Sequence, residues 1–174
     1  MKIRILYGAG IAVIIALVNS FFVDIYGTES TAIRTILGYL PLLVLAIGLF
    51  LSMRKAKKEI YKNDLTFGQA IYSGIIVCVV AAISLGVIYF FYYKFINTNY
   101  ADKVISMEVP VMKKNNFTAS QIDSETNKIR ESYYPVNVLF GTIIFMLVAG
   151  IAISAIYSSI FRTKDTFTEV AKRK

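Results

Sequence analysis

Few side chains in this sequence have the types and spacing that chemistry requires. The chain has no histidine and one cysteine, Cys78. Histidine ligation of zinc or haem is therefore excluded. A thiol within an apolar stretch is poorly ionised, so we interpret Cys78 as a packing residue. The remaining candidates for acid–base chemistry are the loop carboxylates Asp102, Glu108, Asp123 and Glu125. We expect these carboxylates to keep a helix surface soluble, and we expect no catalytic residue, metal ion or cofactor.

Four long stretches without a charged residue dominate the sequence. They cover residues 5–23, 35–53, 65–93 and 132–161. A hydrocarbon core about 30 Å thick needs about 20 helical residues at 1.5 Å each, so each stretch is long enough to cross a bilayer. The composition, 56% hydrophobic and 17% charged, agrees. The expected fold is an all-α membrane protein with four transmembrane helices and an extracytoplasmic helical hairpin between the third and the fourth.

We expect these helices to form a single membrane domain over residues 1–174. Pro41 lacks a backbone N–H donor, so it predicts a kink in the second helix. The expected bounds are about 3–23, 33–58, 67–95 and 134–161 for the four helices and 96–133 for the outer helical insertion.

Basic residues lie mainly on one side of the four helices. Twelve of the 19 Lys and Arg residues precede the first helix, join the second to the third, or follow the fourth. Because basic segments are retained in the cytoplasm, both termini of this multi-pass membrane protein are predicted to be cytoplasmic. We assign the net charge of +8 to this topology and to contact with the lipid bilayer, and not to nucleic-acid binding.

Small residues recur every four positions along three of the expected helices. Such smooth stripes let helix backbones approach closely in lipid, where association depends on van der Waals contact. We assign them to helix packing, either within one bundle or against another membrane subunit. The assigned packing residues are Gly8, Ala12, Ala16, Gly74, Cys78, Ala82, Gly86, Gly150 and Ser154.

Two threonines stand three residues before a glutamine, which is the spacing of a capping box. Thr66 is followed by Gln69, and Thr118 is followed by Gln121. At this spacing the hydroxyl and the amide cap each other's backbone N–H groups. The pairs therefore predict that helices begin near residues 67 and 119.

The connection between the third and fourth helices has room for specific recognition. We expect two short helices there, over residues 99–109 and 119–131, the first capped by Asn99 and ended ahead of Pro110. An aromatic belt at the membrane boundary explains most of the nearby rings. Five consecutive aromatics at 89–93 cover every helix face, so some point inward or at a neighbouring protein. The assigned recognition surface is Tyr89, Tyr92, Tyr93, Tyr100, Phe117, Ile122, Ile129 and Tyr133.

The capping and aromatic motifs together resemble an uncharacterised four-helix membrane family of Bacteroidota, domain of unknown function 4199. The resemblance rests on residues 66–70, on the aromatic exit at 92–96 and on residues 117–122, within a matching order of four helices. It covers nearly the whole chain. It implies an inner-membrane protein of four helices with no assigned activity and no site residues.

Two classes of function fit this sequence. The first is a non-enzymatic accessory or scaffold protein that associates with another membrane or envelope protein, or with a second copy of itself. The alternative is a small lipid or solute carrier that uses the break at Pro41 and the polar residues Asn19, Ser73 and Thr142. Proton-coupled carriers usually place an ionisable group at membrane depth. Its absence from the four uncharged stretches favours the accessory protein, whereas a polar cleft between helices would favour the carrier.

Overall fold

The protein is all-helical over the part that the computed structural model describes, which is residues 2–26 and 31–163, with side chains over 2–20 and 39–163. Long apolar runs with small-residue stripes satisfy their backbone groups internally as helices. The elements in chain order are α1 (Lys2–Tyr26), α2 (Thr31–Glu59), α3 (Phe67–Phe91), the π-helix η1 (Tyr92–Ile96), α4 (Tyr100–Lys114), α5 (Ala119–Ser132) and α6 (Pro135–Phe161).

Four of these segments are long and apolar enough to cross a membrane. They contain 19, 21, 30 and 27 residues, and each reaches the range of about 17–25 residues that crosses a hydrocarbon core about 30 Å thick. The chain is therefore a multi-pass membrane protein. The four candidate spans are Lys2–Ser20, Tyr39–Glu59, Phe67–Ile96 and Pro135–Phe161.

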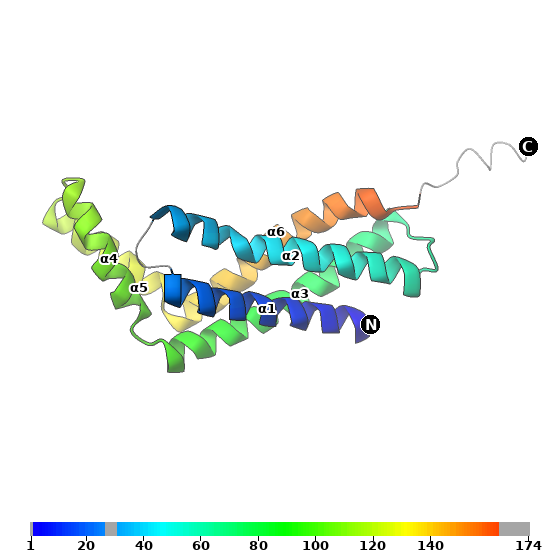
Figure 1. The fold of residues 1–174 in the computed structure, drawn as a ribbon, viewed down its shortest axis with the longest axis horizontal. Helices are drawn as coiled ribbons and strands as arrows, with labels where there is room; N and C mark the ends of the chain where they lie inside the picture. The colour runs from blue at the N-terminus through cyan, green and yellow to red at the C-terminus, as the bar shows by residue number, and fades with distance from the viewer. Residues whose placement is uncertain (1, 27–30, 164–174) are drawn as a thin grey trace, which may run out of the picture.

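The four spanning helices lie alongside one another, and α4 and α5 lie together beyond one end of them (Figure 1). The start of α1, the connection between α2 and α3, and the end of α6 lie at the opposite end. Helix α3 packs most extensively against α6 and next against α1, while α2 packs mainly on α1. Of the four candidate spans, the one that contains α3 has the largest buried share, in agreement with its central position.

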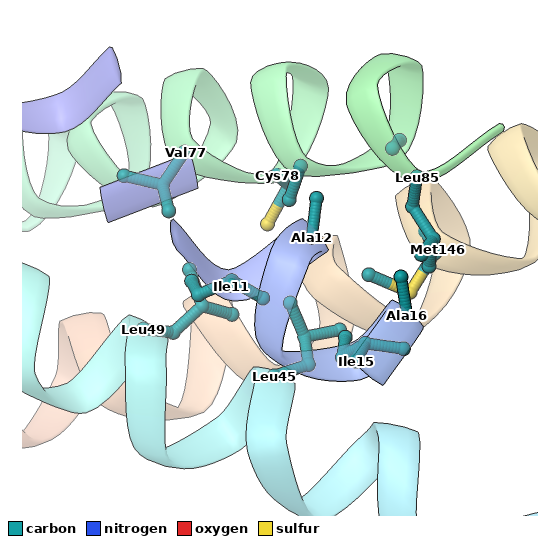
Figure 2. Close-up of a cluster of buried hydrophobic side chains, with 12 residues drawn as sticks. Ile11, Ala12, Ile15, Ala16, Leu45, Leu49, Val77, Cys78, Leu85 and Met146 are labelled. Carbon is teal, nitrogen blue, oxygen red and sulfur yellow. The ribbon is translucent and has the colours of Figure 1, made fainter. Parts of the chain in front are cut away.

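The main core lies where α1 fits between α2 and α3. Figure 2 shows Ile11 and Ile15 of α1 beside Leu49 and Leu45 of α2, with Cys78 of α3 on the other side of α1. Ile15, Leu45 and Leu49 are completely buried. Lipid chains are as apolar as these side chains, so the interface is stabilised by close van der Waals packing and not by exclusion of water.

A tight turn joins α2 to α3 at the end with the basic residues. Lys62 and Asn63 adopt positive φ values of 49° and 69°. Thr163, which follows α6, closes this turn: its N–H donates to the Leu65 carbonyl at 2.8 Å and its hydroxyl donates to the Asn63 carbonyl at 2.9 Å. The turn is thus bonded to the end of α6. The basic residues Lys164, Lys172, Arg173 and Lys174, which contribute to the topology prediction, lie outside the described residues.

The helix expected over 67–95 is found as one span, Phe67–Ile96, whose last turn, Tyr92–Ile96, has π geometry. One expectation about the connection that follows it is wrong in detail. The helix expected over 99–109 runs instead to Lys114, with Pro110 inside it, and Asn99 makes no side-chain cap. Proline has no N–H, so the carbonyl four residues before Pro110 lacks its helical donor. Pro110 is exposed, and water can donate to that carbonyl instead. The helix therefore continues.

Candidate functional site

The small residues of α3 and α6 meet in pairs across the interface between these helices. A Cβ atom added at Gly74 would collide with the Ser154 hydroxyl, and one added at Gly150 would collide with the Cys78 sulfur. The Cys78 Sγ and the Ser154 Oγ lie 3.7 Å apart. Each glycine thus makes room for the side chain opposite it. The predicted stripes of the two helices face each other.

The other predicted packing residues face neighbouring helices too. A Cβ at Gly8 would lie 2.7 Å from the Val80 Cβ, which places α1 directly on α3. A Cβ at Gly86 would lie 3.1 Å from the Leu139 carbonyl oxygen of α6. The alanines of these stripes are buried, with exposures of 0% for Ala12, 8% for Ala16 and 0% for Ala82.

Both threonine–glutamine pairs form capping boxes in the structure. The Thr66 hydroxyl accepts from the Gln69 N–H at 3.3 Å, and the Thr66 N–H donates to the Gln69 amide oxygen at 3.1 Å. Thr118 and Gln121 repeat the arrangement at 3.3 and 2.8 Å. These bonds satisfy orphan donors at the starts of α3 and α5, which is why the helices begin at these points.

Five of the eight residues assigned to recognition form one connected set of rings, which we call the tyrosine cluster. Its members are Tyr89, Tyr92, Tyr93, Tyr100 and Tyr133. Tyr93, Tyr100 and Tyr133 form a triangle with ring centroids 5.3, 5.9 and 4.9 Å apart, within the range of favourable aromatic contacts. They join η1, α4 and the end of α5. The tyrosines therefore hold the α4–α5 pair on the bundle.

The π-helix gives the tyrosine cluster its shape. The N–H of Asn97 bonds to the carbonyl of Tyr92 at 2.9 Å, five residues back, which is the wider π spacing. The Asn97 side chain is 9% exposed; its amide donates to the Tyr92 hydroxyl at 3.3 Å, and its oxygen accepts from the Lys103 ammonium at 3.4 Å. This buried amide joins η1 to α4. Only the unusual aromatic run in the sequence hints at such a turn.

A pocket of about 290 Å³ opens beside the tyrosine cluster, and we call it the tyrosine pocket. It lies between η1, α4, the end of α5 and the start of α6. Arg130 at its edge pairs with Asp102 at 3.4 Å, and both side chains are largely exposed. The pocket thus combines aromatic walls with cationic groups. Its lining includes Tyr93, Lys94, Asn97, Tyr100, Arg130, Tyr133 and Tyr134.

The other three predicted recognition residues lie along the α4–α5 pair. Phe117 is 41% exposed and lies in the connection between the two helices. The 15 residues of α4 separate it from Tyr100 by about 20 Å at 1.5 Å per residue, so it does not belong to the tyrosine cluster. Ile122 and Ile129 are partly buried on α5. The structure thus divides the predicted surface into the tyrosine cluster and three residues along the α4–α5 pair, from Phe117 at its far end to Ile129, one turn before Tyr133.

Three of the four residues assigned to the alternative carrier meet at one place, and the fourth, Ser73, does not. Asn19, Pro41 and Thr142 line a cavity of about 270 Å³ between the spanning helices, and the Asn19 amide donates to the Tyr89 hydroxyl. Ser73 is absent from that lining and lies instead 3.4 Å from the Tyr61 hydroxyl. A pocket between helices therefore exists with three of the four expected residues, but most of its lining side chains are apolar.

The sequence pattern did not single out Arg4, which is a buried cation. Its side chain is 7% exposed, and its guanidinium lies 5.6 and 5.8 Å from the ring centroids of Tyr61 and Tyr72. One terminal nitrogen donates to the Tyr61 hydroxyl at 2.8 Å, while Nε has no hydrogen-bond partner. No ion pair to Arg4 is found within the described ranges. Cation–π attraction to two rings compensates part of the lost hydration.

A family model described as "Protein of unknown function (DUF4199)" matches residues 5–163. The chain belongs to this family. No curated protein and no solved structure matches the chain. The resemblance drawn from the capping and aromatic motifs is therefore confirmed. The match takes in all four apolar spans, both capping boxes and the tyrosine cluster, so these are features of the part of the chain that identifies it as a DUF4199 protein.

Proposed function

We propose that this DUF4199 protein is a non-enzymatic accessory or scaffold protein of the bacterial inner membrane that associates with another membrane or envelope protein. The observation that supports this proposal best is the tyrosine pocket. Tyrosine and arginine are the residues most enriched where protein interfaces concentrate their binding energy, and such residues lie in concave, partly desolvated places. The pocket offers both types around a volume of about 290 Å³.

The proposal places α4 and α5 outside the cytoplasm and both termini inside it. The end of the bundle opposite α4 and α5 carries Arg54, Lys55, Lys57, Lys58 and Lys62, and basic segments of this kind are retained in the cytoplasm. The α4–α5 pair would then stand above the outer leaflet. An envelope protein, or a second copy of this chain, would meet the tyrosine pocket there.

The rigid attachment of α4 and α5 supports the same role. Three ring contacts fix the base of the pair, and the Asn137 amide donates to the Glu131 carbonyl at 2.8 Å where α5 gives way to α6. A surface that is already ordered loses less conformational freedom on binding, and so more of its contact energy appears as affinity. The pocket is therefore suited to a lasting association.

The test is cross-linking at the pocket in living cells at native expression level. A photoreactive phenylalanine analogue would replace Tyr134, which lines the pocket and is 61% exposed. The matched control replaces Phe95, an aromatic that is 65% exposed and does not line the pocket. We expect one membrane protein, or a second copy of this chain, to be joined through position 134 only, and the additional change Arg130→Ala to weaken the adduct. Equal labelling from both positions would contradict the proposal.

A small-solute carrier is the second candidate, and the cavity of about 270 Å³ beside Pro41 favours it. Asn19 and Thr142 would bind the solute, and the proline would let α2 open. A protein that purifies as a monomer with a small molecule bound, and that loses it in Thr142→Val, would favour the carrier over the accessory protein. Thr142→Val keeps the shape of the side chain and removes its hydroxyl.

A further inference from the structure

A groove runs between α1 and α2 on the surface of the bundle, and we call it the α1–α2 groove. Its volume is about 540 Å³, within the usual range of ligand sites of roughly 300–1,000 Å³. Nine of its ten lining residues carry no charge, and the tenth is Lys55. It is separate from the tyrosine pocket and from the cavity beside Pro41. The lining is Leu6, Tyr7, Gly10, Ile11, Ile14, Val44, Ile47, Gly48, Leu51 and Lys55.

We propose that the α1–α2 groove binds one phospholipid of the leaflet that borders Lys55, with an acyl chain along the groove and the headgroup phosphate at the Lys55 ammonium. This binding does not depend on the proposed accessory role. Two properties of the groove, its length and its single charge, identify the occupant.

The length of the groove matches one leaflet. Its lining runs from residue 6 to 14 on α1 and from 44 to 55 on α2, which is about 12 and 16 Å at 1.5 Å per residue. A bilayer core is about 30 Å thick, so the groove covers half of it. An acyl chain of one leaflet needs only this half.

The charge of the groove lies at one end, where a headgroup would be. Lys55 is the last lining residue of α2, and its ammonium lies 6.0 Å from the centroid of the Tyr7 ring. The ammonium is 3.7 Å from the Glu59 carboxylate, but the two side chains are 43% and 50% exposed. An exposed pair of this kind is weak, so the ammonium remains available to a phosphate. The opposite end of the groove, at Ile14 and Val44, is apolar.

Two glycines give the groove its depth in different ways. A Cβ added at Gly48 would collide with the Ile11 side chain, so this glycine lets α1 and α2 approach at the floor. A Cβ added at Gly10 would meet nothing within 4 Å, so the space beside Gly10 is open. A larger side chain at Gly10 would therefore fill the groove without displacing a neighbour. This makes Gly10 the position at which to block it.

The test measures lipid retention by the purified full chain in detergent with native mass spectrometry. The probes are palmitoyl-oleoyl phosphatidylglycerol and the diacylglycerol with the same chains, which lacks the phosphate. Gly10→Leu should lose both lipids. Its control is Gly68→Leu, at a glycine that also has nothing within 4 Å of an added Cβ but lies outside the groove. Lys55→Gln should weaken the binding of phosphatidylglycerol about fivefold and leave the binding of diacylglycerol unchanged. Lys58→Gln, at an exposed lysine, should change the binding of neither lipid.

Several results would overturn the proposal. Retention of phosphatidylglycerol by Gly10→Leu equal to that of Gly68→Leu would show that the groove is not the site. Equal losses of phosphatidylglycerol binding in Lys55→Gln and Lys58→Gln would show that the effect of a lysine charge does not depend on its place at the end of the groove. A dimer that Gly10→Leu dissociates would assign the groove to a second copy of the chain. Lys55→Gln changes an exposed side chain, so its result stands even if Gly10→Leu does not fold.

Discussion

The guanidinium of Arg4 donates a 2.8 Å hydrogen bond to the hydroxyl of Tyr61, 57 positions along the chain. Tyr61 lies in the connection between α2 and α3, and its hydroxyl is in turn 3.4 Å from the Ser73 hydroxyl. One buried cation thus joins the start of α1 to the turn and to α3. Because this contact joins α1, the α2–α3 connection and α3, the start of α1 and the α2–α3 connection stabilise each other.

We expect Tyr61→Phe to lower the stability of the protein. The substitution keeps the ring near Arg4 but removes the hydroxyl that accepts from it, and a hydrogen bond to a charged group is worth about 1.5–3 kcal/mol. Tyr72→Phe is the control. The Tyr72 ring also lies near Arg4, but the hydrogen bond from Arg4 goes to the Tyr61 hydroxyl. Thermal unfolding in detergent at a fixed scan rate measures both. Equal midpoints for the two variants would contradict the expected role.

The contact between Gly74 and Ser154 predicts the effect of one added methyl group. We expect Gly74→Ala to destabilise the bundle by about 1–3 kcal/mol, because its Cβ would lie 2.7 Å from the Ser154 Cβ. Gly141→Ala is the control: its Cβ meets nothing within 4 Å, and alanine in a helix is favoured over glycine by about 0.5–1 kcal/mol.

A compensating change makes the packing prediction specific. In Gly74→Ala with Ser154→Gly, the nearest remaining atom of residue 154 is its Cα, 3.6 Å from the added Cβ. The double variant should therefore be less destabilised than the sum of the single ones, as measured by a double-mutant cycle in detergent. Additive losses would mean that the two positions do not share this contact.

Local chemistry made part of this structure predictable from sequence. The four spans follow from uncharged length, and the starts of α3 and α5 follow from threonine and glutamine at fixed spacing, because these signals act within one turn of helix. Small residues at four-residue intervals likewise identify the face of a helix that packs closely. None of these inferences requires information about which helices are neighbours in the bundle.

The remaining features depend on contacts between distant segments. The inward tyrosine triangle needs η1 to meet both α4 and α5, and no local pattern states that Tyr93 faces Tyr133, 40 positions later. The change to π geometry at Tyr92 is stabilised by the buried Asn97, which bonds to Lys103. Arg4 looks in sequence like any basic residue before an apolar helix. Arg4 is buried because Tyr61, in the α2–α3 connection, packs over its guanidinium, and this contact cannot be read from the local sequence.

The capping box at α5 predicts a local change in helix order. We expect Thr118→Ala to weaken the first turn of α5 by about 1 kcal/mol, the typical value of a lost threonine cap. Hydrogen exchange should accelerate at the amides of residues 120–122 and remain unchanged in the spanning helices. Thr126→Ala is the control, because the Thr126 hydroxyl donates to the Asp123 carbonyl within the helix and does not cap its start. Unchanged exchange at the first turn in Thr118→Ala would contradict the capping role.

The tyrosine cluster predicts how firmly α4 and α5 are attached. Tyr133→Ala removes two ring contacts of the triangle, each worth about 0.5–1.5 kcal/mol beyond burial. We expect faster hydrogen exchange throughout α4 and α5, with exchange in α3 and α6 unaffected. Tyr134→Ala removes a ring that is 61% exposed and outside the cluster, so it should leave exchange unchanged. Similar exchange in the two variants would mean that other contacts hold the pair.

The distribution of basic residues predicts which end of the bundle is reached from outside the cell membrane. The two variants are Lys58→Cys, at the basic end of the bundle, and Ser124→Cys, on α5. Both positions are exposed. The native Cys78 is completely buried, so the unaltered chain should give little background. An impermeant maleimide applied to spheroplasts should label position 124 at once and position 58 only after lysis, because the basic segment is held in the cytoplasm. Labelling of position 58 alone would reverse the orientation and would place the tyrosine pocket, with any partner that it binds, in the cytoplasm.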